Sequence, residues 1–310
     1  MKIVFAGSSE FAIPALEELL ACRKHEVALV LSQPARPKGR RQVLEDTPLA
    51  QCAAQNSLSL YCPEDVNCAE SIEKILSAGA DILITASYGA FLGRTLRKAF
   101  PLGAINLHPS LLPKYRGASP IRAALLAGEK VTGNSIFRLA AKMDAGDILV
   151  QEKLEILPLE NYSSLHLRLA NLAAQSLIDY LDDPQKVEPK PQDHSLATYS
   201  KMVQKSDLVL DFSRSAGSLQ DAIRAYALEP GAYGVFRGKQ LKILEAELIE
   251  DAPRHAVEEI CEIIKNKGFV ISTGDGGLLI RKVQAAGKKM MDAWAYHLGA
   301  RLQIGERFGL

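Results

Sequence analysis

Short, almost continuously apolar runs alternate with helical patterns through the first half of the chain. The runs lie at residues 2–6, 26–31, 81–86 and 104–107, and helical spacing of apolar side chains appears near 11–20, 50–55, 71–77 and 94–99. This alternation predicts βαβ units and a mostly parallel sheet. Runs that are apolar at nearly every position fit strands covered on both faces. We therefore predict an α/β domain whose ligands bind beyond the carboxyl ends of its strands.

The pattern changes after about residue 205. A further helix is predicted near 163–181, and residues 182–198 are polar and rich in proline, which predicts a linker. A helix near 215–226 then precedes short strand candidates at 233–237, 240–247, 260–265, 268–273 and 277–284. Such spacing predicts a small β-barrel or sandwich. We predict a domain over 1–190, a linker over 191–206 and a second domain over 207–310.

Composition limits the classes of partner and compartment. The 310 residues carry a net charge of +1, so a nucleic acid or membrane would have to be held by local patches. Five cysteines form no CxxC pair, which indicates a reducing, cytoplasmic environment. No apolar run approaches the ~20 residues that span a bilayer. The histidines are scattered and HExxH is absent, so we expect no metal site.

Two polar residues end the apolar run at 104–107. Asn106 and His108 share one face of a strand, because side chains alternate, and Pro109 cannot extend the ladder. An amide beside an imidazole can polarise a carbonyl: the amide donates to the developing oxyanion, and the histidine donates or transfers a proton. A nearby carboxylate would fix the histidine tautomer and raise its pKa. Asp144 and Asp147, in a turn after the strand predicted at 134–139, are the candidates.

Less specific interpretations exist for each of these residues. His108 also fits a structural histidine with its hydrogen bonds satisfied, and Asp144 and Asp147 also fit ordinary turn chemistry. A basic loop at 33–41 contains Arg36, Lys38, Arg40 and Arg41, which can bind phosphates or simply be solvated. Gly7 does not begin a GxGxxG motif, so a dinucleotide is not expected.

The string NLHPSLLPKYRGASP, at 106–120, resembles the folate-dependent formyltransferases, which move a formyl group from 10-formyltetrahydrofolate to an amine. The resemblance implies a Rossmann-like catalytic domain in which Asn106, His108 and Asp144 form the catalytic trio. It also places folate near the strand ends and the Asp144 turn, with Ile136 fitting plain core equally well and Arg116 either structural or close to ligand. The implied folate contacts are Tyr88, Gly89, Leu92, Ser110, Leu111, Leu112, Pro113 and Ile136.

The opening FAGSSEFA, the basic loop, and the segments TGDG (273–276) and QAAGKKM (284–290) resemble the methionyl-tRNA branch of that family. This resemblance implies a C-terminal OB-like barrel that helps to bind tRNA. The implied activity is formylation of the α-amine of the aminoacylated initiator methionyl-tRNA in translation initiation, by a monomer. The tRNA-binding cations would be Arg36, Lys38, Arg40, Arg41, Lys205, Lys288 and Lys289.

The chain departs from the family pattern at several places, two of which bear on the basic loop and on the Asp144 turn. Gln42 and Val43 stand where the family's basic loop has two lysines, and Lys142-Met143 stand before Asp144 where the family has Gly-Leu. Three alternatives share the same motif: formylation of an amino-sugar nucleotide, hydrolysis of formyltetrahydrofolate, and an inactive RNA-binding protein on this scaffold. The basic loop and the AGKK segment argue against the first two, and the intact trio argues against the third.

Overall fold

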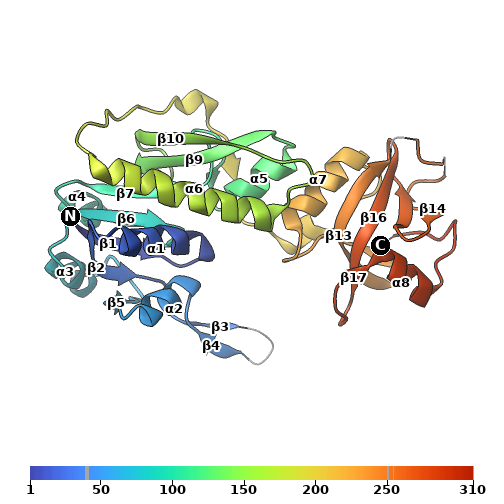
Figure 1. Cartoon of the computed structure of the whole chain (residues 1–310), viewed down its shortest axis with the longest axis horizontal. Helices are drawn as coiled ribbons and strands as arrows, with labels where there is room; N and C mark the ends of the chain where they lie inside the picture. Colours follow the sequence, from blue (N-terminus) through green and yellow to red (C-terminus); the bar gives the residue numbers. More distant parts are fainter. Residues whose placement is uncertain (39–41, 250, 254, 310) are drawn as a thin grey trace. The chain divides into compact units, whose positions relative to one another are not determined.

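The computed structural model describes residues 1–38, 42–249, 251–253 and 255–309, which form two compact units (Figure 1). The first unit consists of Met1–Pro120, Val131–Glu155 and His166–Ser200. The second consists of Ile121–Lys130, Ile156–Leu165 and Lys201–Leu310. Each unit has its own sheet, as the change in sequence pattern predicts.

A seven-stranded sheet with the order β10-β9-β7-β6-β1-β2-β5 forms the first unit. The strands from β7 to β5 run parallel, whereas β9 pairs antiparallel with both β7 and β10, so the predicted α/β class is confirmed. The strands are β1 (Lys2–Gly7), β2 (Glu26–Leu31), β5 (Leu60–Tyr61), β6 (Ile82–Ala86), β7 (Ala104–His108), β9 (Val131–Arg138) and β10 (Ile148–Glu155). The helices are η1 (Glu10–Ala12), α1 (Ile13–Cys22), α2 (Pro48–Gln55), α3 (Ala69–Ser77), α4 (Arg94–Ala99), α6 (Tyr162–Asp182) and η2 (His194–Leu196).

Helices cover both faces of the central strands, which explains why those strands are apolar throughout. On one face, Val4 and Leu83 pack with Ile75 of α3 and Leu96 of α4. On α6, the main-chain oxygen of Leu169 accepts a hydrogen bond of 2.6 Å from the buried amide of Asn134 in β9. Alternate strand residues therefore reach different helices, as a doubly covered sheet requires.

Several elements of the first unit were not predicted. The hairpin β3 (Arg36–Lys38) and β4 (Val43–Glu45) lies in the segment predicted as a loop, and Arg40 and Arg41 fall outside the described residues. The edge strand β10 was missed because its exposed half, QEKLE, is polar. The short strand β11 (Tyr199–Ser200) pairs in parallel with β8 (Arg116–Gly117), so the end of the polar segment 182–198 leads directly into a strand of this unit.

An antiparallel sheet with the order β12-β13-β16-β15-β14 forms the second unit, and β17 pairs with β16. The strands are β12 (Tyr233–Phe236), β13 (Lys239–Ile249), β14 (Ile260–Ile264), β15 (Gly268–Ser272), β16 (Gly277–Ala285) and β17 (Met291–Asp292). The helices are α7 (Ala216–Tyr226), α8 (Ala293–Ala300), η3 (Lys205–Leu208) and α5 (Pro120–Leu126), of which α5 enters this unit from Ile121 on. All five predicted strands are present.

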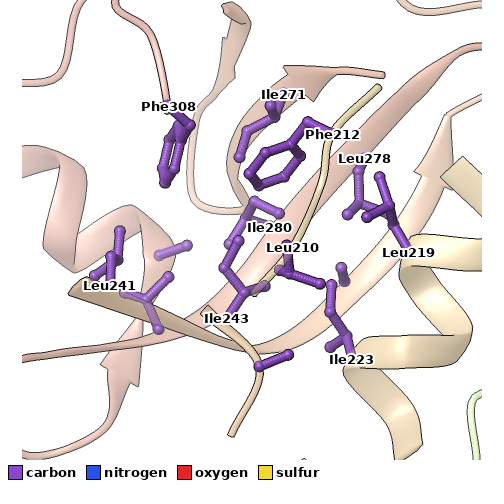
Figure 2. Packing of buried hydrophobic residues seen from close by; sticks show 14 of the residues in the cluster. Leu210, Phe212, Leu219, Ile223, Leu241, Ile243, Ile271, Leu278, Ile280 and Phe308 are labelled. Carbon is purple, nitrogen blue, oxygen red and sulfur yellow. The ribbon is translucent and has the colours of Figure 1, made fainter. Parts of the chain in front are cut away.

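The chain's last residues join the two edges of this sheet. Phe308 forms a bridge to Phe236 in β12, and Arg307 forms one to Glu259 beside β14. The strands therefore close into a barrel, which confirms the predicted OB-like class. Figure 2 shows Phe308 and Phe212 at one side of the apolar cluster that fills this barrel. Within the described residues, no helix has the length and apolar character needed to cross a membrane.

Candidate active site

The carboxyl end of β7 carries the two polar side chains that the sequence singled out. The strand lies between β6 and β9 in the middle of the sheet. Asn106 and His108 alternate with Ile105 and Leu107, so they lie on the face that Ala104 shares with the apolar cluster around α3 and α4. The predicted common face of Asn106 and His108 is therefore present.

The amide of Asn106 is oriented by a neighbouring strand. Thr85 in β6 lies directly opposite Asn106 in the sheet register. Its hydroxyl donates a 2.7 Å hydrogen bond to Asn106 Oδ1 and lies 3.1 Å from the main-chain oxygen of Ile105. With Oδ1 occupied in this way, the Nδ2 amino group of the half-buried Asn106 is left as a donor toward a ligand.

His108 is 4 % exposed and is held in one tautomer by the main chain. Its Nε2 lies 3.0 Å from the oxygen of Tyr115, and since a carbonyl only accepts, Nε2 carries the proton. Nδ1 faces Asp144 Oδ2 at 3.9 Å. The ring also meets the edge of Phe137, with centroids 6.3 Å apart.

Burial lowers the pKa of His108, and the field of Asp144 and the Tyr115 carbonyl raise it by less. The expected effect of the carboxylate is present, since Asp144 raises the pKa of His108, but the loss of hydration outweighs it and the net shift is downward. The tautomer is fixed by Tyr115, and not by the carboxylate as expected. At neutral pH the ring is uncharged, and its Nδ1 lone pair faces Asp144.

Asp144 is the one of the two candidate aspartates whose carboxylate faces His108. It occupies the predicted turn after β9 with φ +49°, a left-handed conformation that is uncommon outside glycine. Its Oδ2 accepts a 2.7 Å hydrogen bond from the main-chain N–H of Gly117. Gly117 itself has φ +107°, and a Cβ there would lie 2.4 Å from the oxygen of Ser200. The site therefore depends on close main-chain contacts around the Asp144 turn and Gly117.

The residues predicted to contact folate fall into three groups, which are the segment after β6, the loop after β7, and Ile136 in β9. Tyr88 and Leu92 are buried together in the cluster on the Asn106 face, and burial raises the pKa of Tyr88 to about 12. Gly89 follows Tyr88 with φ +85°. Ser110, Leu111, Leu112 and Pro113 form the loop after β7.

That loop is fixed by side-chain hydrogen bonds. Ser110 Oγ donates to the oxygen of Lys114 at 2.6 Å, and Ser135 Oγ accepts from the N–H of Leu112 at 3.1 Å. Ile136 pairs with Leu107, so it lies on the opposite face of the sheet from His108. The structure therefore does not bring Ile136 to this site, and it is a core residue.

The cations predicted to bind tRNA lie on both units. Arg36 in β3 forms a 3.0 Å exposed ion pair with Glu64, and Lys38 ends the same strand. Lys205 begins η3, and Lys288 and Lys289 lie in the turn after β16, all three exposed. Arg40 and Arg41 fall outside the described residues.

Sequence reasoning missed four groups that hydrogen-bond to the trio: the Thr85 hydroxyl, the Tyr115 carbonyl, the Gly117 N–H and the side chain of Gln192. A hydroxyl inside the apolar run 81–86 was the available signal for Thr85. No sequence signal marks Gln192, which lies in a polar, proline-rich stretch, or a main-chain oxygen. Among the described residues, no group of three or more His, Cys, Asp or Glu side chains has a metal-binding arrangement.

The formyl transferase family profile matches residues 1–181, and the profile of the formyl transferase C-terminal domain matches residues 202–301. The chain belongs to this family. It is a formyl-transferring enzyme, and the site at the end of β7 lies within the first matched segment.

The most similar relatives include proteins named methionyl-tRNA formyltransferase. One from Thermotoga maritima is 38% identical over 310 residues, which cover 99% of this chain and 98% of the relative. Another, from Roseiflexus castenholzii, is 37% identical over 312 residues, covering 100% and 99%. The similarity therefore extends over both units.

Solved structures share the fold at low identity. Methionyl-tRNA formyltransferase from Clostridium thermocellum has a TM-score of 0.58 at 16% identity, covering 81% of this chain and 95% of that one. HypX from Aquifex aeolicus in complex with tetrahydrofolic acid has a TM-score of 0.65 at 14% identity, covering 96% of this chain and 46% of that one. WlaRD, a sugar 3N-formyl transferase, has a TM-score of 0.65 at 18% identity, covering 93% and 99%.

Proposed function

We propose that this protein transfers a formyl group from 10-formyltetrahydrofolate to the α-amine of initiator methionyl-tRNA. The observation that carries the chemistry is the arrangement of a donor amide, a neutral buried imidazole and a carboxylate at one strand end, with His108 Nδ1 and Asp144 Oδ2 3.9 Å apart. The choice of acceptor is supported by relatives of that name that match both units at 37–38% identity.

In the proposed mechanism, the amine of methionyl-tRNA attacks the formyl carbon and forms a new C–N bond. Asn106 Nδ2 donates to the oxygen that becomes negatively charged. Nδ1 of neutral His108 accepts the proton that the amine loses, and Asp144 stabilises the resulting imidazolium. Collapse of the tetrahedral intermediate breaks the bond from carbon to the folate nitrogen, which takes that proton. The Nε2–H of His108 keeps its hydrogen bond to the Tyr115 carbonyl throughout the reaction.

We further propose how the parts of the chain divide this work. Residues 1–190 would carry the chemistry and the folate contacts, from Tyr88 to Pro113, and 191–206 would connect them to 207–310. The connecting segment would add Lys205, and the second domain Lys288 and Lys289, to the tRNA contacts of Arg36, Lys38, Arg40 and Arg41. All five cysteines are free thiols, which supports a cytoplasmic location, and we propose that the protein acts as a monomer.

The test is formylation of charged initiator tRNA with 10-formyltetrahydrofolate as donor. We expect activity in the parent, a loss of roughly 10²–10³-fold in kcat for Asn106→Ala, and near-complete loss for His108→Ala. His255→Ala, in the second unit, is the matched control and should retain activity. A parent that instead hydrolyses the folate, or formylates an amino-sugar nucleotide, would show that the substrate is wrong while the family stands.

The pH dependence follows from the state of His108. The base must be neutral, and burial lowers its pKa below the ordinary 6.5. The contribution of His108 should therefore be fully present above pH 6.5 and be lost as the pH falls through the lowered pKa, whereas the α-amine of the substrate titrates separately at higher pH. Asp144 raises that pKa, so Asp144→Asn should lower kcat and also move the acid limb to lower pH. An acid limb below pH 6.5 that does not move in Asp144→Asn would contradict this role for His108.

A further inference from the structure

The segment Lys190–Ser200 is the last part of the first unit. Along its length it forms hydrogen bonds with β10, with Tyr115 and with β8. Lys190 exchanges two 2.8 Å main-chain hydrogen bonds with Ile148 in β10. Thr198 Oγ1 accepts a 2.8 Å hydrogen bond from the N–H of Tyr115, the residue whose oxygen holds His108. Its C-terminal end is β11, paired with β8.

Gln192 lies in this segment and is 7% exposed. Its Nε2 donates to two main-chain oxygens of the catalytic turn, Asp144 O at 3.0 Å and Gly146 O at 2.6 Å. Its Oε1 accepts from Arg116 Nη2 at 2.6 Å and from Arg116 Nε at 3.2 Å. A guanidinium only donates and a main-chain oxygen only accepts, so the orientation of this amide is fixed and all its hydrogen-bonding capacity is used.

Arg116 is 3% exposed. Its Nη2 donates to Oε1 of Gln192 and also lies 2.9 Å from Nδ1 of His194. The guanidinium charge polarises the Gln192 amide and strengthens its two donated hydrogen bonds. The residue after Arg116, Gly117, donates its N–H to the Asp144 carboxylate. Asp144 is thus held at its main chain by Gln192 and at its side chain by Gly117.

Such holding is needed at this position. A non-glycine residue with φ +49° is costly by itself and persists where its surroundings over-determine it. At Gly146, a Cβ would lie 1.7 Å from the oxygen of Arg138, so the turn has no room to shift in that direction. The hydrogen bonds from Gln192 secure the two carbonyls on either side of Ala145.

We propose that Gln192 and Arg116 are positioning residues that hold the Asp144 turn, and with it the Asp144 carboxylate, against His108. This role deepens the proposed formyl transfer and rests on it for the kinetic consequences. The sequence left the role of Arg116 undecided between structure and ligand contact. In this proposal Arg116 orients the Gln192 amide. Only an amide can both accept from Arg116 and donate to two carbonyls, so neither a carboxylate nor an apolar side chain replaces Gln192.

The first test reads the position of Asp144 without any substrate. Around His108 the neighbours are Asp144 from the turn after β9, the Phe137 ring of β9 and the Tyr115 carbonyl, and of these Asp144 carries the charge that acts on it. Titration of His108 by NMR in the ligand-free protein therefore reports the Asp144 carboxylate. We expect Gln192→Met to lower the pKa of His108, as Asp144→Asn does. Asn134→Ala, which removes another buried amide bonded to a main-chain oxygen, should leave the titration unchanged.

The second test is kinetic. Displacing the carboxylate should lower kcat for formyl transfer by up to about 100-fold with little change in KM. In the Asp144→Asn background, Gln192→Met should cost almost nothing more, because the residue acts through Asp144. Gln192→Glu retains the contact with Arg116 as an ion pair but loses both donors, so it should show the same loss and covers the case in which Gln192→Met fails to fold.

The two tests separate the two proposals. A wild-type titration of His108 in Gln192→Met, or full additivity of the Gln192 and Asp144 losses, would overturn the positioning role. A parent that does not formylate methionyl-tRNA, together with the expected shift in the His108 titration, would remove the substrate assignment and leave the positioning role standing.

Discussion

At the scale of single residues, the proposed site depends on the hydrogen-bond partners that orient Asn106 and His108. The Thr85 hydroxyl donates to Oδ1 of Asn106, and the Tyr115 carbonyl accepts from Nε2 of His108. These bonds leave the amino group of Asn106 and Nδ1 of His108 for the proposed roles of donor and base. Desolvation keeps His108 neutral and Asp144 moderates that effect. The orientation of the proposed catalytic groups therefore depends on their hydrogen-bond partners as well as on their own chemistry.

Thr85→Val tests the orientation of the amide. Valine has the shape of threonine without the hydroxyl, so Asn106 would lose the partner that keeps Nδ2 directed at the ligand. We expect kcat to fall by about 10-fold, the equivalent of one hydrogen bond, with KM little changed. Thr132→Val, at another buried strand position of the same sheet, is the control. An unchanged kcat for Thr85→Val would show that Asn106 needs no such support.

At the scale of elements, the barrel depends on a segment with no regular strand of its own. Phe308 is 1% exposed, stacks on Phe236 with centroids 4.8 Å apart and lies 5.5 Å from Phe212. The bridges made by Arg307 and Phe308 join the edges at β12 and at β14. Closure leaves fewer unpaired strand edges, and it concentrates the packing on one aromatic side chain.

Phe308→Ala should therefore destabilise the second unit by about 3–5 kcal/mol, because it removes a buried aromatic ring and leaves a cavity. Chemical denaturation followed by near-UV circular dichroism would measure the change. Leu298→Ala, at an exposed position on α8, should stay within about 0.5 kcal/mol. A loss below about 1 kcal/mol for Phe308→Ala would mean that closure contributes little to the barrel.

At the scale of the whole molecule, the net charge is only +1, so the chain as a whole exerts little long-range attraction on a polyanionic substrate such as tRNA. The cations proposed for tRNA are spread over both units, and the described ones are mostly exposed, so their contribution is electrostatic and local. Arg36 already pairs with Glu64 in the absence of tRNA, so a phosphate would have to replace that carboxylate. Binding should consequently fall steeply as salt rises.

Lys288→Glu combined with Lys289→Glu tests whether cations of the second unit contribute to tRNA binding. We expect weaker binding of methionyl-tRNA and a smaller salt dependence, by about one unit of slope for each phosphate that is no longer neutralised. Folate affinity, and kcat at saturating tRNA, should be unchanged because the catalytic trio lies in the other unit. Lys265→Glu combined with Lys267→Glu, two cations of the same unit outside the predicted set, is the control for charge alone. Equal losses from both pairs would contradict specific contacts by Lys288 and Lys289.

The amino-acid pattern is sufficient to predict the central strands of the sheet, the barrel strands and the strand end that carries Asn106 and His108. Apolar periodicity is local, and it reports burial directly wherever a strand is covered on both faces, as in β1 and β6. The folded chain was needed to establish which aspartate faces His108, which way its pKa moves, and that Ile136 lies on the far face. Folding also brings Gln192, from a stretch without apolar pattern, against Asp144, which is 48 residues away in the chain. Hydrogen bonds between distant segments leave no periodic trace, because one polar side chain and a main-chain oxygen suffice to make them.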